Sequence, residues 1–389
     1  MKQEIINFLK YNKYAYTTYY YAMSAVINMV KLVVKPDNKL ILFNSFAGRK
    51  YDDSPKAIYE VMRKDKRFRG YHFVWAFHEP GQFDVKGARK IKTDGFAYFI
   101  TALKSRVWIT NSSVERGLNF KGKNTFYLNT WHGSPIKKMG NDIASDNQSF
   151  SSKGKNKTDI MNTQSEFEAA IFSKCFGIPK SHFLKVGLPR NDELANYTEK
   201  KRQELRNKLG IPKNKKVILY CPTFREYEKD EHRGVVLAPP IDLKKWEKTL
   251  REQYVLLFRA HYEVSKVMKI EENDFVKNVT DYPVLDELMI ASDVLISDYS
   301  SIFFDYSIMD KCMLHFTYDY DKYEEKRGMY FDIRKYLSGA SNEDDLINLL
   351  VELNFDNELH RTIKFREKYV NYYGNASTKT VDHIAEIIL

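Results

Sequence analysis

A histidine between a tryptophan and a glycine, in residues 131–133, marks the point where an apolar stretch of the chain ends. The preceding residues 126–130 predict a strand, and α/β enzymes commonly place reactive groups at the carboxyl end of a strand. The imidazole of His132 can take up or release a proton near neutral pH, and the glycine allows the backbone to approach a ligand closely. Lys137 and Lys138 add positive charge. The segment predicts a base that acts on an anionic substrate; the alternative is a buried structural histidine before a basic helix.

Four predicted strands in the second half of the chain also end in polar or charged side chains. These strands cover residues 216–221, 254–258, 275–279 and 294–296. The carboxyl ends of parallel strands lie at one edge of a sheet, so the side chains that follow them should line a single crevice. These side chains belong to Arg225, Arg259, His261, Asp281, Asp298, Ser300 and Ser301.

The residue types in this crevice favour a diphosphate. Ser300 and Ser301 precede residues 302–309, which predict a helix, and a helix N-terminus offers backbone N–H groups to phosphate. A serine that only caps the helix is the alternative. Arg225 and Arg259 could each clamp a phosphate oxygen through two N–H groups. No Gly-x-Gly-x-x-Gly follows a predicted strand and no Gly-x-x-x-x-Gly-Lys occurs, which argues against the usual dinucleotide fold and against a P-loop.

Composition limits the classes of protein that fit. A chain of 389 residues with 43% hydrophobic residues suits two folded domains. The formal charge of +11 and the pI near 9.1 point to nucleic acid, an anionic membrane surface or a phosphate-rich substrate. The three cysteines are far apart, so the sequence predicts neither disulfides nor a zinc site, and a reducing compartment fits best.

Residues 14–30 form an uncharged segment with five tyrosines and several aliphatic residues. The segment is too short and too polar for a confident membrane span, and it lacks the compact apolar core of a signal peptide. Tyrosines favour the membrane interface, and lysines flank the segment on both sides, so we expect a helix that lies on an anionic leaflet. The alternative is a helix that packs on the first domain or on a partner subunit, which would allow a homo-oligomer.

The chain from residue 36 onward alternates strands and helices, which predicts parallel sheets. In the first half, strands are expected at 40–43, 71–77, 106–110, 126–130, 157–162 and 183–187, with a helix at 54–63. A charged helix at 198–209 marks the predicted domain boundary. The polar run 141–157 predicts a loop near the histidine, and long loops beside a site often act as lids.

Five blocks of the sequence resemble the signature of the CDP-glycerol glycerophosphotransferases, which build teichoic acids and related polymers of the Gram-positive cell envelope. They are Trp131–Gly140, Gly187–Asp192, Tyr220–Arg225, Arg259–Tyr262 and Ile296–Tyr306. The blocks occur in the family's order and the resemblance covers about residues 40 to 385. The family usually has Thr where this chain has Ser134 and often Trp where it has Phe224. Both differences keep the hydroxyl or the aromatic ring.

The resemblance implies a GT-B fold, in which two doubly wound Rossmann-like α/β domains face each other across a cleft. A membrane-interface helix would cover residues 1–35, an acceptor domain residues 36–197, and a CDP-alditol-binding domain residues 198–364. A C-terminal crossover helix at about 365–389 would return to the acceptor domain. The implied reaction passes glycerol phosphate from CDP-glycerol to a hydroxyl of a lipid-linked glycerophosphate or disaccharide acceptor, with release of CMP, at the cytoplasmic face of the membrane.

The resemblance also implies roles for individual residues. His132 would be the general base and His261 would donate a proton to the diphosphate as CMP leaves. Arg225 and Arg259 would neutralise phosphate charge, Ser300 and Ser301 would hold the diphosphate, and the loop Asp281, Tyr282, Pro283 and Val284 would receive the cytosine. Lys137 and Lys138 would orient the acceptor phosphate. Further substrate-binding candidates are Gly133, Ser134, Arg190 and Asp298.

Several alternatives stay open at this point. A CDP-ribitol donor, or a sugar-nucleotide glycosyltransferase of the same fold, would share most of these features. A nonenzymatic binder of nucleic acid is disfavoured, because the cationic residues follow strands and are not gathered along one helix. No cofactor or resident metal is expected, and magnesium would serve only as a counterion of the substrate. Primase or polymerase activity, and a wall teichoic acid or a capsule pathway, are equally compatible with these motifs.

Overall fold

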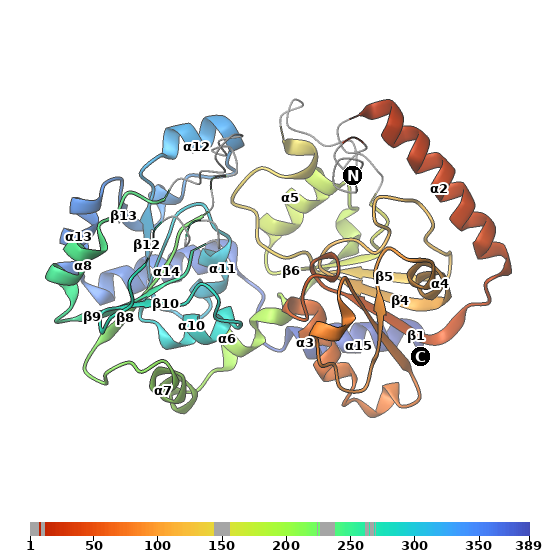
Figure 1. Ribbon diagram of the computed structural model, residues 1–389, viewed down its shortest axis with the longest axis horizontal. Coiled ribbons are helices and arrows are strands. Elements are labelled where there is room, and N and C mark those ends of the chain that lie inside the picture. The colour runs from red at the N-terminus through yellow and green to blue at the C-terminus, as the bar shows by residue number, and fades with distance from the viewer. Residues whose placement is uncertain are drawn as a thin grey trace. The chain divides into compact units, whose positions relative to one another are not determined.

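The computed structural model describes residues 8, 12–143, 156–223, 225, 238–260, 264, 268 and 270–389. The chain forms two compact units. Unit 1 is drawn from Met1–His132, Met139–Asp192 and Tyr372–Leu389, and unit 2 from Gly133–Lys138 and Glu193–Asn371. Each unit is an α/β domain with a wholly parallel sheet (Figure 1), as the sequence predicted.

The sheet of unit 1 has the strand order β3-β2-β1-β4-β5-β6-β7. Its strands are β1 (Asp37–Asn44), β2 (His72–Phe77), β3 (Arg89–Lys92), β4 (Ser105–Thr110), β5 (Phe126–Asn129), β6 (Ile160–Thr163) and β7 (Phe183–Lys185). The apolar run Leu40–Phe43 in β1 is buried on both faces, as in central strands of parallel sheets. The strand order reverses between β1 and β4, and ligands of such sheets bind at this switch point.

Helices cover both faces of this sheet (Figure 1). They are α2 (Lys13–Val33), α3 (Asp53–Met62), α4 (Phe96–Lys104), α5 (Glu166–Phe176) and α15 (Ala376–Ile388), while α6 (Asp192–Asn196) begins the passage to unit 2. On one face, Ile58 of α3 and Ile384 of α15 enter the same core. On the other, Ile27 of α2 and Ala102 of α4 share a second core. The C-terminal helix therefore belongs to unit 1, beside α3.

The sheet of unit 2 has the order β10-β9-β8-β11-β12-β13, so its own switch point lies between β8 and β11. Its strands are β8 (Lys216–Cys221), β9 (Tyr254–Phe258), β10 (Val276–Asn278), β11 (Val294–Ser297), β12 (Cys312–Phe316) and β13 (Ser338–Ala340). Its described helices include α7 (Glu199–Lys208), α8 (Leu243–Leu250), α10 (Leu285–Ala291), α11 (Ile302–Ser307), α12 (Tyr320–Arg327), α13 (Glu343–Val351) and α14 (Phe355–Tyr369).

The short strand β3 was absent from the sequence prediction. Its four residues, Arg89–Lys92, contain one buried side chain, Ile91, so no apolar run marks it. It pairs only with β2, at the edge of the sheet, where charged residues are common. Edge position and short length hid the strand from the hydrophobic pattern.

The segment Gly133–Lys138 packs with unit 2, whereas the sequence analysis placed it in the first domain. Lys137 forms an antiparallel bridge with Met329, and the backbone N–H of Lys138 donates to the carbonyl of Gly328 at 3.0 Å. The N–H of Tyr330 donates to the carbonyl of Ile136. Backbone pairing with the segment after α12 therefore decides where these residues belong.

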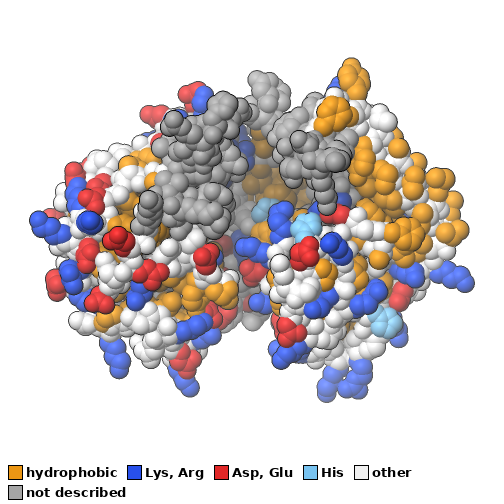
Figure 2. All heavy atoms as spheres, in the orientation of Figure 1, with side chains coloured by type: hydrophobic (Ala, Val, Ile, Leu, Met, Phe, Trp, Pro, Cys, Tyr) orange, Lys and Arg blue, Asp and Glu red, His pale blue; other side chains and the backbone are white. Residues whose placement is uncertain are grey.

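Helix α2 runs along the outside of unit 1 (Figure 1). Its inner side is tied to residues 117–120: the Tyr16 hydroxyl donates to the carbonyl of Gly117 at 2.9 Å, and the Asn28 amide donates to that of Asn119 at 2.8 Å. Its outer side exposes Tyr14, Tyr21, Met29, Leu32 and Val33. Figure 2 shows this apolar surface over α2. In the described part of the chain, no helix combines the length and the apolar character needed to cross a membrane.

Candidate active site

Three loops meet at the switch point of unit 1. Phe46 follows β1, Asn111 follows β4 and His132 follows β5. The Asn111 side chain accepts a hydrogen bond from the backbone N–H of Phe46 at 2.7 Å, and the Ser112 hydroxyl accepts one from the N–H of Ala47 at 2.9 Å. These bonds hold Phe46 and Ala47 in left-handed backbone conformations, with φ of 46° and 56°. The strained turn brings the Phe46 ring next to the imidazole.

His132 is fixed in orientation by its Nδ1 atom, which lies 2.7 Å from the backbone carbonyl of Asn111. A carbonyl can only accept, so Nδ1 carries the proton and Nε2 keeps its lone pair. The ring stacks on Trp131, with centroids 4.2 Å apart, and lies 5.7 Å from the Phe46 ring. Trp131 itself has a φ of +53° and donates its backbone N–H to the Asn129 side chain. The geometry gives a positioned base.

The surroundings of His132 favour its neutral form. The residue is exposed at the surface of unit 1, yet the protein packed around its ring disfavours the charged form and lowers its pKa. The carboxylate of Asp53 raises the pKa, whereas Arg190 and Arg49 lower it. Asp53 and Arg190 are themselves an ion pair with an N–O distance of 3.2 Å. The net direction is downward, so the imidazole is available as a base at neutral pH.

Gly133, the next residue, lies against Ser301 within unit 2. A Cβ atom at Gly133 would be 2.9 Å from the Ser301 Oγ atom, which is closer than side chains normally come. Ser300 accepts a hydrogen bond from the N–H of Ile302, the first residue of α11, at 3.3 Å. Ser301 thus contacts the segment that follows His132, and Ser134 within this segment is buried.

Arg259 follows β9 and organises the loop after β10. Its Nη1 atom donates to the carbonyls of Val279 and Tyr282, at 3.1 and 2.6 Å. The Tyr282 hydroxyl donates to Glu287, and Lys208 lies over the Tyr282 ring. The predicted cytosine loop, Asp281–Val284, is therefore held by Arg259 at the carboxyl edge of the sheet.

Arg225 differs from the expectation of a phosphate clamp. Its side chain is buried and makes a double hydrogen bond to Asp319, with N–O distances of 2.7 and 2.9 Å. Its Nη1 atom donates to the Thr223 carbonyl and lies 2.9 Å from Asp298. Three rings surround the guanidinium, those of Tyr299, Tyr318 and Tyr323. We therefore correct the assignment: Arg225 and the buried Asp298 hold the loop after β8, and the guanidinium is not presented to a phosphate.

The structure places two more of the predicted residues, Lys138 and Arg190, and leaves others outside its described part. Lys138 lies along Gly328, since a Cβ atom at that glycine would be 2.7 Å from its Cδ atom. Arg190 lies beside His132, through its pair with Asp53. His261 falls outside the described residues, as does most of the predicted lid, at 144–155. Among the described residues, no group of three or more His, Cys, Asp or Glu side chains could hold a metal ion.

The comparison with known families decides the class of protein. The sequence profile of the family described as CDP-Glycerol:Poly(glycerophosphate) glycerophosphotransferase matches residues 26–386. The chain belongs to this family. The resemblance of its five sequence blocks and the expected enzyme class, a glycerophosphotransferase, are thereby confirmed.

Relatives of this glycerophosphotransferase carry matching names. It is 34% identical to the teichoic acid poly(glycerol phosphate) polymerase of Staphylococcus epidermidis over 80% of this chain, and it spans 45% of the length of that protein. It is 31% identical to the teichoic acid glycerol-phosphate transferase of Staphylococcus aureus, over 85% of this chain and 88% of the relative. Among solved structures, the wall teichoic acid polymerase TagF matches with a TM-score of 0.82 and 30% identity, over 94% of this chain and 92% of the other. TagF has also been solved after a soak with CDPG.

Some residues around the site of the glycerophosphotransferase were missed by sequence reasoning. Phe46 and Asp53 lie more than 75 residues before His132 and belong to no motif. The only signal was their place after a predicted strand and before a predicted helix.

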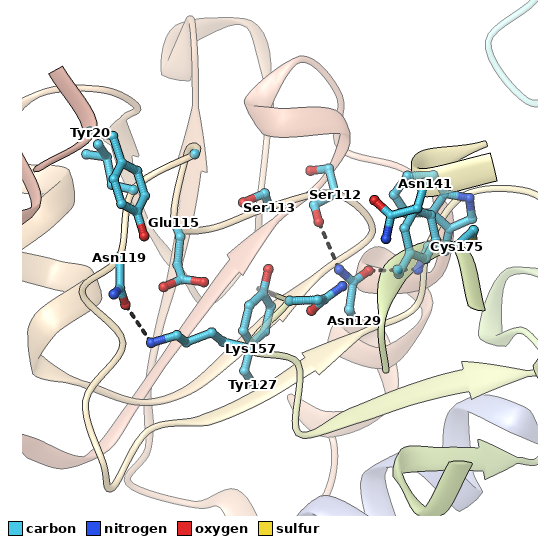
Figure 3. Close-up of a pocket in the computed structure, with 15 residues that line it drawn as sticks. Tyr20, Ser112, Ser113, Glu115, Asn119, Tyr127, Asn129, Asn141, Lys157 and Cys175 are labelled. Atoms are coloured by element: carbon cyan, nitrogen blue, oxygen red, sulfur yellow. Dashed lines mark hydrogen bonds between the residues drawn. The ribbon is translucent and has the colours of Figure 1, made fainter. Parts of the chain in front are cut away.

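A cavity of about 310 Å³ lies in unit 1, and Trp131 is one of its lining residues (Figure 3). Its walls include Glu115 and Lys157, neither of which the sequence analysis singled out. Glu115 lies in a stretch without apolar periodicity, and Lys157 lies where the predicted loop 141–157 meets the predicted strand 157–162, so only the fold brings the two residues together.

Proposed function

We propose that this glycerophosphotransferase transfers a glycerol phosphate unit from CDP-glycerol to a hydroxyl of a lipid-linked acceptor and releases CMP. The observation that carries the proposal is the hydrogen bond between His132 Nδ1 and the Asn111 carbonyl, which leaves Nε2 as a proton acceptor. Membership of the family supports the donor and the transferred group. The names of the relatives support a teichoic acid or a related polymer as the product.

The proposed reaction begins when Nε2 of His132 takes the proton of the acceptor hydroxyl. The hydroxyl oxygen then forms a bond to the phosphorus that carries the glycerol, and the bond from that phosphorus to the bridging oxygen breaks. CMP leaves with the bridging oxygen. His261 is proposed to donate a hydrogen bond or a proton to an oxygen of the diphosphate as CMP leaves.

Unit 2 is proposed to hold the donor. Ser300 and Ser301 would bind the diphosphate, and the loop held by Arg259 would receive the cytosine through its backbone. Lys137 is proposed to orient the acceptor phosphate. Any magnesium would be a counterion of the substrate.

The proposed reaction requires the two units to face each other across a cleft, the GT-B arrangement. The acceptor would enter on unit 1 and the nucleotide on unit 2. The similarity to TagF over 94% of the chain supports this arrangement.

A test compares CMP release by the wild type, His132→Ala and His261→Ala, with CDP-glycerol, CDP-ribitol and a UDP-sugar offered in parallel. Loss of an acid or base should slow turnover by more than about 100-fold. CDP-glycerol binding should survive in His132→Ala, because the base contacts the acceptor. Near-normal turnover in either variant would refute the proposed role of the histidine that it lacks. If the wild type preferred CDP-ribitol, that compound would replace CDP-glycerol as the proposed donor.

We also propose that the outer side of α2 binds an anionic bilayer. The exposed side chains of Tyr14, Tyr21, Met29, Leu32 and Val33 form an apolar strip, and the exposed Lys13 and Lys35 stand at its ends, whereas the Lys31 ammonium donates to Asn28 and to the Phe120 carbonyl. Apolar area and lysines together favour the interface of an anionic membrane, which is where a lipid-linked acceptor resides.

Co-sedimentation with vesicles tests this second proposal. The wild type should bind phosphatidylglycerol vesicles more than phosphatidylcholine vesicles, and the double variant Leu32→Glu/Val33→Glu should lose that binding. Val351→Glu, at an exposed apolar residue of unit 2, is the matched control and should bind normally. Equal binding by all three proteins would contradict the proposal.

A further inference from the structure

The cavity of unit 1 is enclosed by loops that follow β4 and β5 and by the inner side of α2. Four aromatic side chains contribute to its walls, those of Tyr20, Tyr127, Trp131 and Phe176. The rest of the lining is mostly polar. A volume of about 310 Å³ is at the lower end of the range for small-molecule sites. The cavity is therefore large enough for one small polar unit of a ligand.

Glu115 is the group in this cavity that most needs a partner. The residue is only 8% exposed, and its Oε1 atom has no hydrogen-bond partner among the described residues. Figure 3 shows the carboxylate pointing into the space beside Lys157 and Tyr127. The carboxylate already accepts backbone hydrogen bonds from Phe120 and Lys121. A carboxylate can accept more than two hydrogen bonds, so a hydroxyl group of a ligand in the cavity would supply a further donor to this buried group.

Other polar groups of the lining are already engaged in ways that shape the cavity. The Lys157 ammonium donates to the Asn119 side chain at 2.5 Å. The Asn129 amide donates to the Ser112 carbonyl at 2.8 Å. Among the described residues no arginine lines the cavity, although arginine is the usual partner of a phosphate. A carboxylate, amides and aromatic faces suit a neutral unit with several hydroxyls better than a phosphate.

Trp131 connects this cavity to the catalytic base. Its side chain lines the cavity and stacks on the His132 ring at 4.2 Å. A molecule that fills the cavity would therefore contact the residue whose ring stacks on the proposed base. The inner side of α2, through Tyr20, closes the cavity on another side.

We propose that this cavity binds a neutral, hydroxyl-bearing unit of the acceptor next to the unit that reacts, with Glu115 accepting a hydrogen bond from one of its hydroxyls. The inference rests on the proposed function, because it assigns part of the same acceptor. The hydroxyls can come from a sugar of a lipid-linked disaccharide or from a glycerol unit of a growing chain. Glu115 is thus a specificity-determining residue for the acceptor and takes no part in binding the donor.

Steady-state kinetics of wild type, Glu115→Gln and Glu115→Ala test the proposal with two short-chain acceptors. One acceptor carries a disaccharide and a single glycerol phosphate, and the other carries several glycerol phosphates and no sugar. Loss of a hydrogen bond to a charged group should raise the KM for the acceptor by about tenfold or more. The KM for CDP-glycerol should stay within about twofold of the wild type. If the KM rises only for the first acceptor, the unit bound in the cavity is a sugar. If the KM rises for both acceptors, the bound unit is glycerol.

Glu79→Gln, at an exposed glutamate of unit 1, is the matched control and should leave both KM values unchanged. Unchanged acceptor KM in Glu115→Ala, with an active wild type, would overturn the proposal. So would a fall in kcat alone, since that result would indicate only a structural role.

Direct binding separates this inference from the proposed function. If the wild type released no CMP with any donor, the proposed function would fail. Titration of the soluble disaccharide and of glycerol phosphate oligomers into wild type and Glu115→Ala would still measure the cavity. Weaker binding to the variant supports the site, and equal binding or none to either protein overturns it.

Discussion

Gly133 approaches Ser301 so closely that a methyl group on its Cα would lie 2.9 Å from the serine Oγ atom and 3.3 Å from its Cβ atom. Both residues belong to unit 2, although Gly133 directly follows His132 of unit 1. The glycine therefore brings the backbone beside the proposed base against a proposed diphosphate-binding hydroxyl. This contact requires that residue 133 have no side chain.

The substitution Gly133→Ala should disturb Ser301 and weaken CDP-glycerol binding. Overpacking at such a contact costs about 1–3 kcal/mol, which corresponds to about 5- to 150-fold in the dissociation constant if the serine must move. Isothermal titration with CDP-glycerol measures the effect. Gly81→Ala is the control, because a Cβ atom there meets nothing within 4 Å. Identical affinity in the two variants would show that Ser301 does not contact the donor.

The acid limb of the pH profile should report His132. Because the protein packed around the ring lowers the pKa of the folded imidazole, the active neutral form should persist as pH falls below about 6.5, the usual value. Activity should then decline as pH falls through the lowered pKa. Measurement of kcat/KM between pH 4.5 and 8, chosen to bracket that value, locates the limb.

Two variants should move this limb in opposite directions. Asp53→Asn removes the carboxylate that raises the His132 pKa, so the limb should move to lower pH. Arg190→Gln removes a cation that lowers the pKa, so the limb should move to higher pH. Asp84→Asn, at an exposed residue of the same unit, should leave it in place. If neither substitution shifted the acid limb, His132 would be excluded as the group that titrates there.

Arg225→Ala should destabilise the protein strongly. The substitution leaves the buried carboxylate of Asp298 and the partly buried carboxylate of Asp319 near one another without their cation, and breaking such a buried pair typically costs about 3–5 kcal/mol. Urea unfolding measures this loss, and Arg225→Ala/Asp319→Asn should recover part of it. Arg251→Ala, which removes an exposed pair with Glu247, should cost less than about 1 kcal/mol. A stable Arg225→Ala protein that fails to bind CDP-glycerol would restore the phosphate-clamp assignment.

Glu115→Gln should stabilise the protein at neutral pH. Burial raises the pKa of the Glu115 carboxyl, so its charged form is less favourable in the folded than in the unfolded chain. The raised pKa favours folding while the group is protonated, and that contribution is lost as pH rises through the folded pKa. The Tm of Glu115→Gln should exceed that of the wild type at pH 7, and the difference should shrink below about pH 4.5. A lower Tm at pH 7 would mean that Lys157 and the nearby backbone N–H groups outweigh the burial.

The central strands were predictable because they are continuous apolar runs. Leu40–Phe43 and Val217–Tyr220 are buried, and the strands paired with them lie where the hydrophobic pattern placed them. The buried strand β12 and the short strand β13 were not among the predicted strands. The edge strand β3 was not predictable, because three of its four residues are exposed. The same pattern placed Asn111 and His132 directly after strands. The hydrogen bond between them could not be predicted, because it depends on β4 and β5 being neighbours in the sheet.

Arg225 shows why a residue type after a strand does not fix its role. The sequence places an arginine beyond β8, and a clamp for phosphate was a reasonable expectation. Asp319 is 94 residues further along the chain, and only the packing of the loop after β12 brings it to the guanidinium. The same is true of Glu115, whose distance from Lys157 in sequence hides their shared cavity.

The sequence by itself determined the family, the two parallel-sheet domains and the histidine after β5, because motifs and apolar periodicity are local properties of the chain. Only the tertiary structure decided which nitrogen of His132 is available, that Arg225 is neutralised by carboxylates and that Glu115 faces a cavity. Each of these depends on partners far away in sequence. Protonation and charge are set by the atoms that surround a group, and folding alone assembles those surroundings.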